Sequence, residues 1–203
     1  RIFNAGMKGG KGSVNEGGCR VPLFFRLPGV TEAGRDLAQL ARHIDLFPTF
    51  AELAGMDVSD FGLEGRSLMP LLGTEDVPWP DRTLFFHAGR WPKKGAPGKR
   101  GLGDPNPDSY QYGKFAVRTK DWRLVGDQTL YDLTKDPGET TNVFEEHPEV
   151  AADLLKEYDA WWNQARPLLV NEDAPLDVEK PFEATYLEQE QEEGIPAWDV
   201  PTL

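Results

Sequence analysis

The glycine-rich beginning of the chain is the feature that most constrains its fold. Six of the first 20 residues are glycine, at positions 6, 9, 10, 12, 17 and 18. Such a run favours an irregular loop whose backbone N–H groups can approach a ligand without obstruction by side chains. An apolar run over residues 21–27 follows, and Pro28-Gly29 comes directly after it. This order predicts a short buried strand that ends in a turn.

The single cysteine, Cys19, lies just before this apolar run. One cysteine excludes a disulfide within the chain and a zinc site made of several thiolates. Because Val21-Pro-Leu-Phe-Phe follows, we expect Cys19 to enter the buried strand rather than to act as a nucleophile.

Later segments predict helices and strands by their periodicity. Asp45 before Leu46 predicts an N-cap, and the helix that it begins should end at Gly55. Residues 83–87 and 129–133 are strand-like, and residues 114–119 and 122–125 predict an antiparallel hairpin. Pro148 begins a predicted helix that ends at Arg166-Pro167. Its apolar face comprises Ala151, Leu154, Leu155, Tyr158, Trp162 and Ala165.

These segments divide the chain into residues 1–80, residues 81–168 and a tail over residues 169–203. The formal net charge is −12, but residues 171–203 hold ten acidic residues and one lysine. This local acidity is typical of a solvated extension, with a specific interaction tail as the alternative. We therefore expect no nucleic-acid partner. No run approaches the roughly 18 apolar residues that a membrane span needs, so no membrane partner is expected either.

Lys11 is the most informative polar residue of the glycine-rich loop. Glycines flank it on both sides, and backbone N–H groups can add to its positive charge, which suits an oxyanion such as sulfate or phosphate. A solvated lysine in a turn is the alternative. The segment is not a P-loop, because Gly12 separates Lys11 from Ser13 and no helix is predicted to follow.

Three motifs in the same order resemble the C-terminal portion of arylsulfatase-type sulfatases, in the alkaline-phosphatase-like superfamily. They are G-K-G-S-x-x-E-G-G-x-R-V-P over residues 10–22, H-I-D-L-F-P-T over residues 43–49, and L-Y-D-L-x-x-D-P-G-E-T-x-N over residues 130–142. The resemblance implies an α/β class and an alkaline-phosphatase-like sulfatase fold, truncated to the edge of the large mixed sheet. A small α+β C-terminal subdomain, an antiparallel sheet covered by a helix, should follow.

The resemblance also implies residue roles. Lys11 takes the place of the lysine that contacts the sulfate group. Glu16 and Arg20 belong to the same motif with a structural role, and Arg20 is expected to pair with a carboxylate near the loop. His43 occupies a common family position, where we expect a hydrogen-bonding core residue rather than a catalyst.

Parts of the family's catalytic site have no match in this sequence. Sulfatases of this type use a formylglycine made from the motif C/S-x-P-x-R and a divalent cation, commonly Ca²⁺, held by acidic and amide side chains. Neither that motif nor those ligands are matched in residues 1–203, so no metal ligand is assigned here. We therefore expect the whole protein to hydrolyse sulfate esters and the isolated chain to be inactive.

A basic loop supplies candidate substrate contacts: His87, Arg90, Trp91 and Lys93. Such a loop could bind an aryl sulfate or a sulfated carbohydrate, with a solvated surface loop as the alternative. Two other functions remain open, a phosphonate or phosphodiester hydrolase and a noncatalytic carbohydrate-binding or interaction module. The resemblance further implies a periplasmic or secreted protein, and an exposed sheet edge could allow self-association.

Overall fold

The computed structural model describes residues 3–73, 77–87, 107–168, 181–192 and 194. The chain forms two compact units, Arg1–Leu169 and Val170–Leu203, and each is described by itself. The boundary expected near residue 81 falls inside the first unit and stays a prediction.

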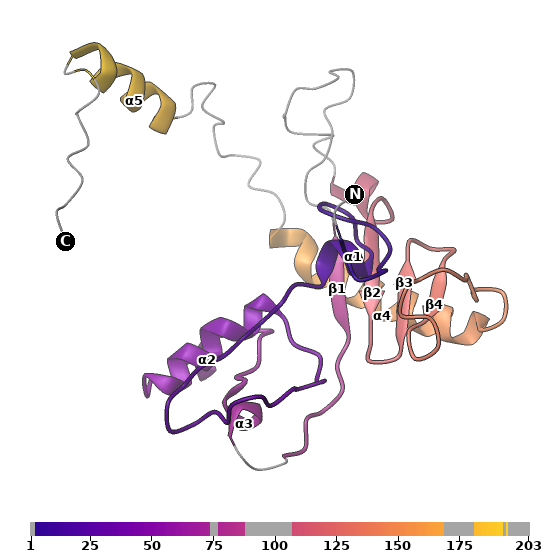
Figure 1. The fold of residues 1–203 in the computed structure, drawn as a ribbon. Helices are drawn as coiled ribbons and strands as arrows, with labels where there is room; N and C mark the ends of the chain where they lie inside the picture. The colour runs from indigo at the N-terminus through magenta and orange to yellow at the C-terminus, as the bar shows by residue number, and fades with distance from the viewer. Residues whose placement is uncertain (1–2, 74–76, 88–106, 169–180, 193, 195–203) are drawn as a thin grey trace. The chain divides into compact units, whose positions relative to one another are not determined.

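A four-stranded antiparallel sheet in the order β1-β2-β3-β4 forms the centre of the first unit (Figure 1). Val117 of β2 lies opposite Phe85 of β1 and Leu124 of β3. The strands predicted over residues 83–87, 114–119, 122–125 and 129–133 are confirmed. Their bounds are Leu84–His87 for β1, Phe115–Arg118 for β2, Trp122–Val125 for β3 and Leu130–Asp132 for β4.

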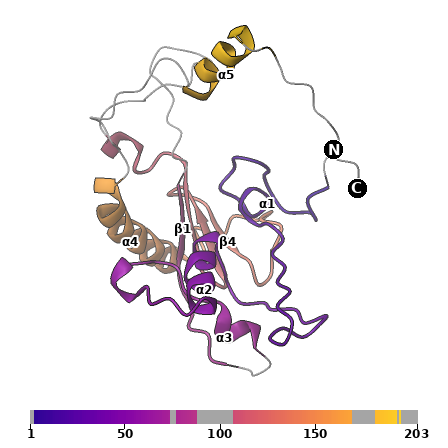
Figure 2. The ribbon, with the colours of Figure 1, turned by 90° about the vertical axis from the view of Figure 1, so that its left-hand side faces the viewer.

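The helix α4, Pro148–Ala165, covers one face of this sheet, as the two views in Figures 1 and 2 show. Its predicted apolar face is confirmed by the buried side chains of Ala151, Leu154, Tyr158 and Trp162. The ring of Phe115 stacks on that of Tyr158, with 4.1 Å between the centroids. Because side chains alternate along a strand, Ala116 and Arg118 of β2 face away from α4. The antiparallel sheet covered by a helix is therefore present as predicted.

The glycine-rich loop and the short helix α1, Glu16–Cys19, lie on the opposite face of the sheet (Figure 2). The one-turn helix differs from the expectation that no helix follows Lys11. The helix predicted after Asp45 is confirmed as α2, Leu46–Leu53. It packs near α3, Met69–Leu72, and a small core forms around Leu68, Leu71 and Leu72.

The strand predicted over residues 21–27 is wrong for this chain. Among the described residues the sheet has four strands, and none of them pairs with this segment. Val21 and Phe24 are 75% and 90% exposed, whereas Phe25 and Leu27 pack against the small core. A strand needs a neighbouring strand for its backbone N–H and C=O groups, and no strand lies beside this segment among the described residues. Within the described ranges, only Leu27 at its end has backbone hydrogen bonds, to the turn at Val30 and Thr31. The segment therefore has the sequence pattern of a buried strand, but no strand among the described residues pairs with it.

The expected strand position of Cys19 is also wrong. This residue ends α1, where its Sγ lies 3.5 Å from the carbonyl oxygen of Ser13, and burial raises the pKa of its thiol. A thiol with a raised pKa is poorly nucleophilic, which agrees with a structural role.

In the second unit, the structure describes the helix α5, Pro181–Glu192. Its side chains from Thr185 to Glu192 are exposed, as the acidic composition predicts. None of the helices in the described ranges is both long enough and apolar enough to cross a membrane.

Candidate functional site

The glycine-rich loop folds tightly on itself. The N–H of Gly17 donates to the carbonyl oxygen of Lys8 at 2.8 Å. A Cβ atom at Gly17 would lie 2.7 Å from the carbonyl oxygens of Lys8 and Gly9, closer than real Cβ contacts allow. A Cβ at Gly18 would clash with the carbonyl oxygen of Ser13 in the same way. These two glycines are therefore required for the approach of one loop segment to another.

Lys11 lies exposed in this loop, between Gly10 and Gly12. Gly12 has a φ of +82°, a conformation that glycine adopts without strain, and its carbonyl oxygen accepts a hydrogen bond from the Lys114 ammonium. Within the described part of the chain, the Lys11 ammonium makes no hydrogen bond or ion pair. Lys11 thus carries a positive charge that an external anion can reach.

Buried ion pairs fix this loop to the sheet. Glu16 of α1 accepts hydrogen bonds from Arg118 Nε of β2, at 3.0 Å, and from Arg123 of β3. Arg123 Nε also donates to the carbonyl oxygen of Val14 at 3.0 Å and lies 3.2 Å from Glu139. Two carboxylates and two guanidinium groups therefore balance one another at the base of the loop, and removal of one would leave an uncompensated buried charge.

Glu139 connects this cluster to the third sequence motif. One of its oxygens accepts the backbone N–H of Glu16 at 3.1 Å. Burial raises the pKa of Glu139, and the N–H of Glu16 and the charge of Arg123 oppose that shift. Its φ of +57° is uncommon for a residue other than glycine, so its tertiary contacts must stabilise this conformation.

The other polar residues of this motif shape the turn that carries Glu139. Asp136 accepts the N–H groups of Thr140, at 2.6 Å, and Thr141, at 2.8 Å. Asn142 Oδ1 accepts the N–H of Leu130 at 3.0 Å, and this contact ties the turn to β4. The motif over residues 130–142 is therefore a structural support for the glycine-rich loop, 120 residues away in the sequence.

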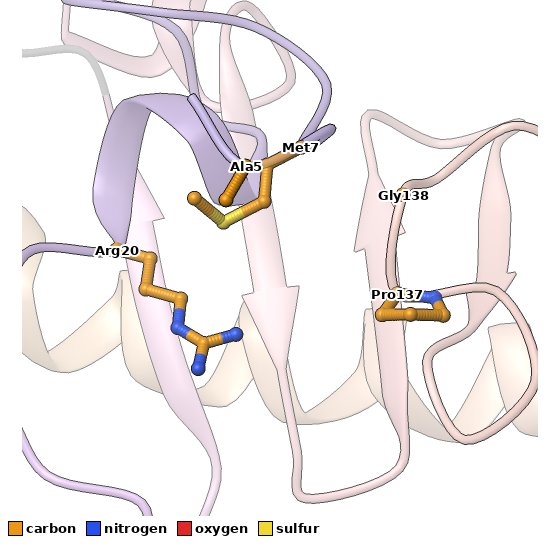
Figure 3. Close-up of a pocket in the computed structure, with 5 residues that line it drawn as sticks. All are labelled: Ala5, Met7, Arg20, Pro137 and Gly138. Carbon is orange, nitrogen blue, oxygen red and sulfur yellow. The ribbon is translucent and has the colours of Figure 1, made fainter. Parts of the chain in front are cut away.

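The ion pairing expected for Arg20 is made by Arg118 and Arg123 instead. Arg20 is exposed, and in the described ranges no carboxylate lies within ion-pair distance of it. It lines a surface cavity of about 280 Å³, with Pro137 on the opposite side and Met7 above it (Figure 3). The roles of Arg118, Arg123 and Glu139 were not predicted from the sequence. Their signal was an arginine inside the apolar strand Trp122-Arg123-Leu124-Val125.

The structure differs from two expectations for the second motif. Asp45 takes the predicted N-cap position of α2, but its side chain makes no capping hydrogen bond to that helix. Its buried carboxylate instead accepts two hydrogen bonds from Arg82 and one each from the N–H groups of Arg42 and Arg66. Burial alone would raise its pKa, but these hydrogen bonds together lower the pKa of Asp45 below its ordinary value of 3.8. His43 is exposed and not a core residue.

The predicted substrate contacts are described only at His87, because Arg90, Trp91 and Lys93 lie outside the described residues. The His87 ring is half-buried on β1, with Nε2 2.9 Å from the carbonyl oxygen of Tyr110. Its centroid lies 5.0 Å from that of Trp162. This ring therefore contacts the core between the sheet and α4.

No metal-binding cluster of three or more His, Cys, Asp or Glu side chains occurs in the parts of the chain that the structure describes. The residues present do not form a cation site of that kind, so no chemical step through a metal is assigned to them.

Comparison with solved structures shows which fold the chain shares. The fold matches the crystal structure of Ps i-CgsB in complex with k-i-k-neocarrahexaose with a TM-score of 0.61 and 23% sequence identity. The match covers 94% of this chain and 38% of that one. The chain therefore shares the fold of that protein over most of its length.

Sequence comparison identifies the family. Residues 10–164 match the family described as N-sulphoglucosamine sulphohydrolase, C-terminal, and the chain belongs to that family. It is 32% identical to human Arylsulfatase D over 174 residues, which are 82% of this chain and 26% of the relative. It is 35% identical to mouse Steryl-sulfatase over 151 residues, which are 67% of this chain and 24% of the relative.

The chain thus spans about a quarter of the length of these two relatives. Their names are those of sulfatases, so the comparisons do not favour the two alternatives, a phosphonate or phosphodiester hydrolase and a noncatalytic module.

Proposed function

We propose that this chain supplies the sulfate-binding lysine of a sulfatase that hydrolyses sulfate esters. The observation that carries the proposal is the placement of Lys11, an exposed lysine without a described partner, in a loop that buried ion pairs hold on the sheet. The sulfate ester gains negative charge on its departing oxygen as the S–O bond breaks. A fixed positive charge at the sulfate group, close to that departing oxygen, would stabilise the transition state more than the ground state.

The remaining chemistry would come from other parts of the whole protein. We propose that these provide a formylglycine nucleophile and a divalent cation, Ca²⁺ by family resemblance. When bound, such a cation would act as a Lewis acid toward the sulfate oxygens. Lys11 alone provides neither function, and therefore the isolated chain should be inactive.

The substrate of the whole protein would be an aryl sulfate or a sulfated carbohydrate. Among the relatives is an N-acetylglucosamine-6-O-sulfatase of Bacteroides thetaiotaomicron, 26% identical over 133 residues. We also propose a periplasmic or secreted location, by resemblance to the family. Fractionation of cells that produce the whole protein, followed by immunodetection, tests it, and recovery from the cytoplasm alone would contradict it.

The exposed apolar segment over residues 21–27 supports a further part of the proposal. Val21 and Phe24 are largely exposed on an extended backbone that has no strand beside it in the described ranges. Edges of this kind pair readily with another strand. In the purified chain we propose that the partner is a second copy, bound through this segment.

The first experiment compares sulfate and phosphate esters. The purified chain should release no product from 4-nitrophenyl sulfate. A polypeptide that joins it to the N-terminal portion of a sulfatase should hydrolyse that ester faster than 4-nitrophenyl phosphate. Turnover by the purified chain, or a preference of the joined polypeptide for the phosphate ester, would overturn the proposed function.

A further inference from the structure

A second cavity, lined by cationic side chains, lies beside the buried ion pairs. Its volume is about 120 Å³. It adjoins the cavity of Figure 3, because Arg20 and Pro137 line both. The residues that matter here are three cations, one carboxylate and one hydroxyl: Arg20, Arg118, Lys120, Glu16 and Thr134.

The cations of this cavity outnumber the available carboxylate. Glu16 already accepts hydrogen bonds from Arg118 and from Arg123, which is buried behind it. The side chains of Arg20 and Lys120 make no hydrogen bond or ion pair to any residue that the structure describes. The cavity therefore has an excess of positive charge.

Arg118 also has unused hydrogen-bond donors. Its Nε donates to Glu16, and its Nη1 donates to the carbonyl oxygen of Lys120 at 2.8 Å. A guanidinium group has five N–H donors, so three remain for a ligand. Burial lowers the pKa of Arg118, and the positive charges of Arg123 and Arg20 contribute to the same shift. An anion in the cavity would relieve this repulsion.

This cavity is separate from Lys11 along the sheet. Lys114, just before β2, holds the carbonyl oxygen of Gly12 beside Lys11. Arg118, at the end of β2, holds Glu16 beside the cavity. Lys114 and Arg118 are four positions apart, and a rise of about 3.3 Å per residue places their Cα atoms about 13 Å apart. The loop is therefore anchored to the sheet at two different points, one beside Lys11 and one beside the cavity.

We propose that Arg20, Arg118 and Lys120 form a second anion subsite, for a sulfate or carboxylate group of a glycan that carries more than one negative charge. The adjoining cavity, lined by Met7 and Pro137, would take the neutral part of the sugar to which that group is attached. Arginine suits this role because its planar donors match both sulfate and carboxylate oxygens. The link to a glycan rests on the proposed sulfatase function, whereas the anion subsite is a property of this chain.

Residue-resolved NMR of the ¹⁵N-labelled, purified 203-residue chain tests the subsite. The probes are glucose 6-sulfate, glucuronate and, as the neutral control, glucose, each up to about 20 mM, which exceeds millimolar dissociation constants. We expect either anion to shift the amide signals of Arg20 and Thr134, and glucose not to shift them. A shift with the sulfate only, or with the carboxylate only, identifies the anionic group that the subsite takes.

Three variants separate this subsite from Lys11. Arg20→Gln and Lys120→Gln should each weaken the binding that Thr134 reports by roughly tenfold, since each removes a charged donor. Both residues are exposed and lack a described partner, so the folded spectrum should persist. Lys11→Gln should leave the shifts at Thr134 unchanged while it removes any shift at Gly12. Absence of anion shifts at Thr134, or binding that is equally strong in Arg20→Gln and Lys120→Gln, would overturn the proposed subsite. Neither result would bear on the proposed role of Lys11.

Discussion

The two parts of the first unit differ in how far their large apolar side chains are buried. In the sheet half, residues 84–87 and 107–168, Phe115, Leu124 and Leu130 are fully buried against α4. In the loop half, residues 3–73, Phe3 and Phe24 are about 90% exposed, and the aromatic rings of α2 are about half exposed. The sheet half packs its large apolar side chains against α4, whereas the loop half has only the small core around Leu68, Leu71 and Leu72 and leaves several aromatic rings exposed.

The largest difference should come from matched phenylalanine truncations, one in each half. Phe115→Ala removes a buried ring and should cost about 3–5 kcal/mol of unfolding free energy. Phe24→Ala should change it by less than about 0.5 kcal/mol, because that ring is already in solvent. Urea denaturation, at a concentration where the chain is monomeric, measures both values. Equal losses would contradict the distinction between the halves.

The second prediction concerns the ion pairs that join the halves. Arg123→Met keeps the length of the side chain but leaves Glu16 and Glu139 without the shared guanidinium, and should cost about 3–5 kcal/mol. Amide hydrogen exchange should then rise in the glycine-rich loop before it rises in α4. Lys156→Met, at an exposed position of α4, is the matched control. A loss no larger than that of the control would mean that the pairs do not hold the loop.

A third prediction uses pH to examine Asp45 in the loop half. The folded-state pKa of Asp45 lies below its ordinary value, so its contribution to stability is present above pH 3.8 and is lost as the pH falls through the folded-state pKa. The difference in unfolding free energy between the parent chain and Asp45→Asn should therefore shrink below pH 3.8. Asp153→Asn, at an exposed position of α4, serves as the control. A difference that grows with acid would contradict the assignment.

The smallest effect is expected for self-association through residues 21–27. The molar mass from light scattering should rise with concentration toward that of a dimer. Phe24→Ser should keep the chain monomeric, while Tyr186→Ser, an exposed aromatic position on α5, should not. A monomer at every concentration would remove this part of the proposal.

The local sequence pattern predicts the sheet half most accurately, because the pattern and the observed burial agree there. Alternating apolar residues predicted β2 and β3, and the period of Ala151, Leu154 and Tyr158 predicted α4. It was wrong at residues 21–27, because a continuous apolar run shows that a strand can be buried but not which strand lies beside it.

In the candidate site, too, the local sequence predicts only features that are formed by neighbouring residues. Lys11 could be singled out from its flanking glycines and its family motif, because both lie within a few residues. The contacts that hold the glycine-rich loop on the sheet could not be predicted in this way, because the contact between Glu16 and Glu139 joins positions 123 residues apart. Asp45 and Arg82 are 37 residues apart, so the local sequence predicts an N-cap at Asp45 but not its ion pair with Arg82.

The most direct test of the account is the effect of Lys11 on sulfate ester hydrolysis in the polypeptide that joins this chain to the N-terminal portion of a sulfatase. Lys11→Ala should lower kcat for 4-nitrophenyl sulfate by roughly 10²–10³-fold, the loss typical for one electrostatic contact to a transition state. The control Lys156→Ala should leave kcat unchanged. An unchanged kcat in Lys11→Ala would show that the lysine does not contact the reacting sulfate and would contradict the account.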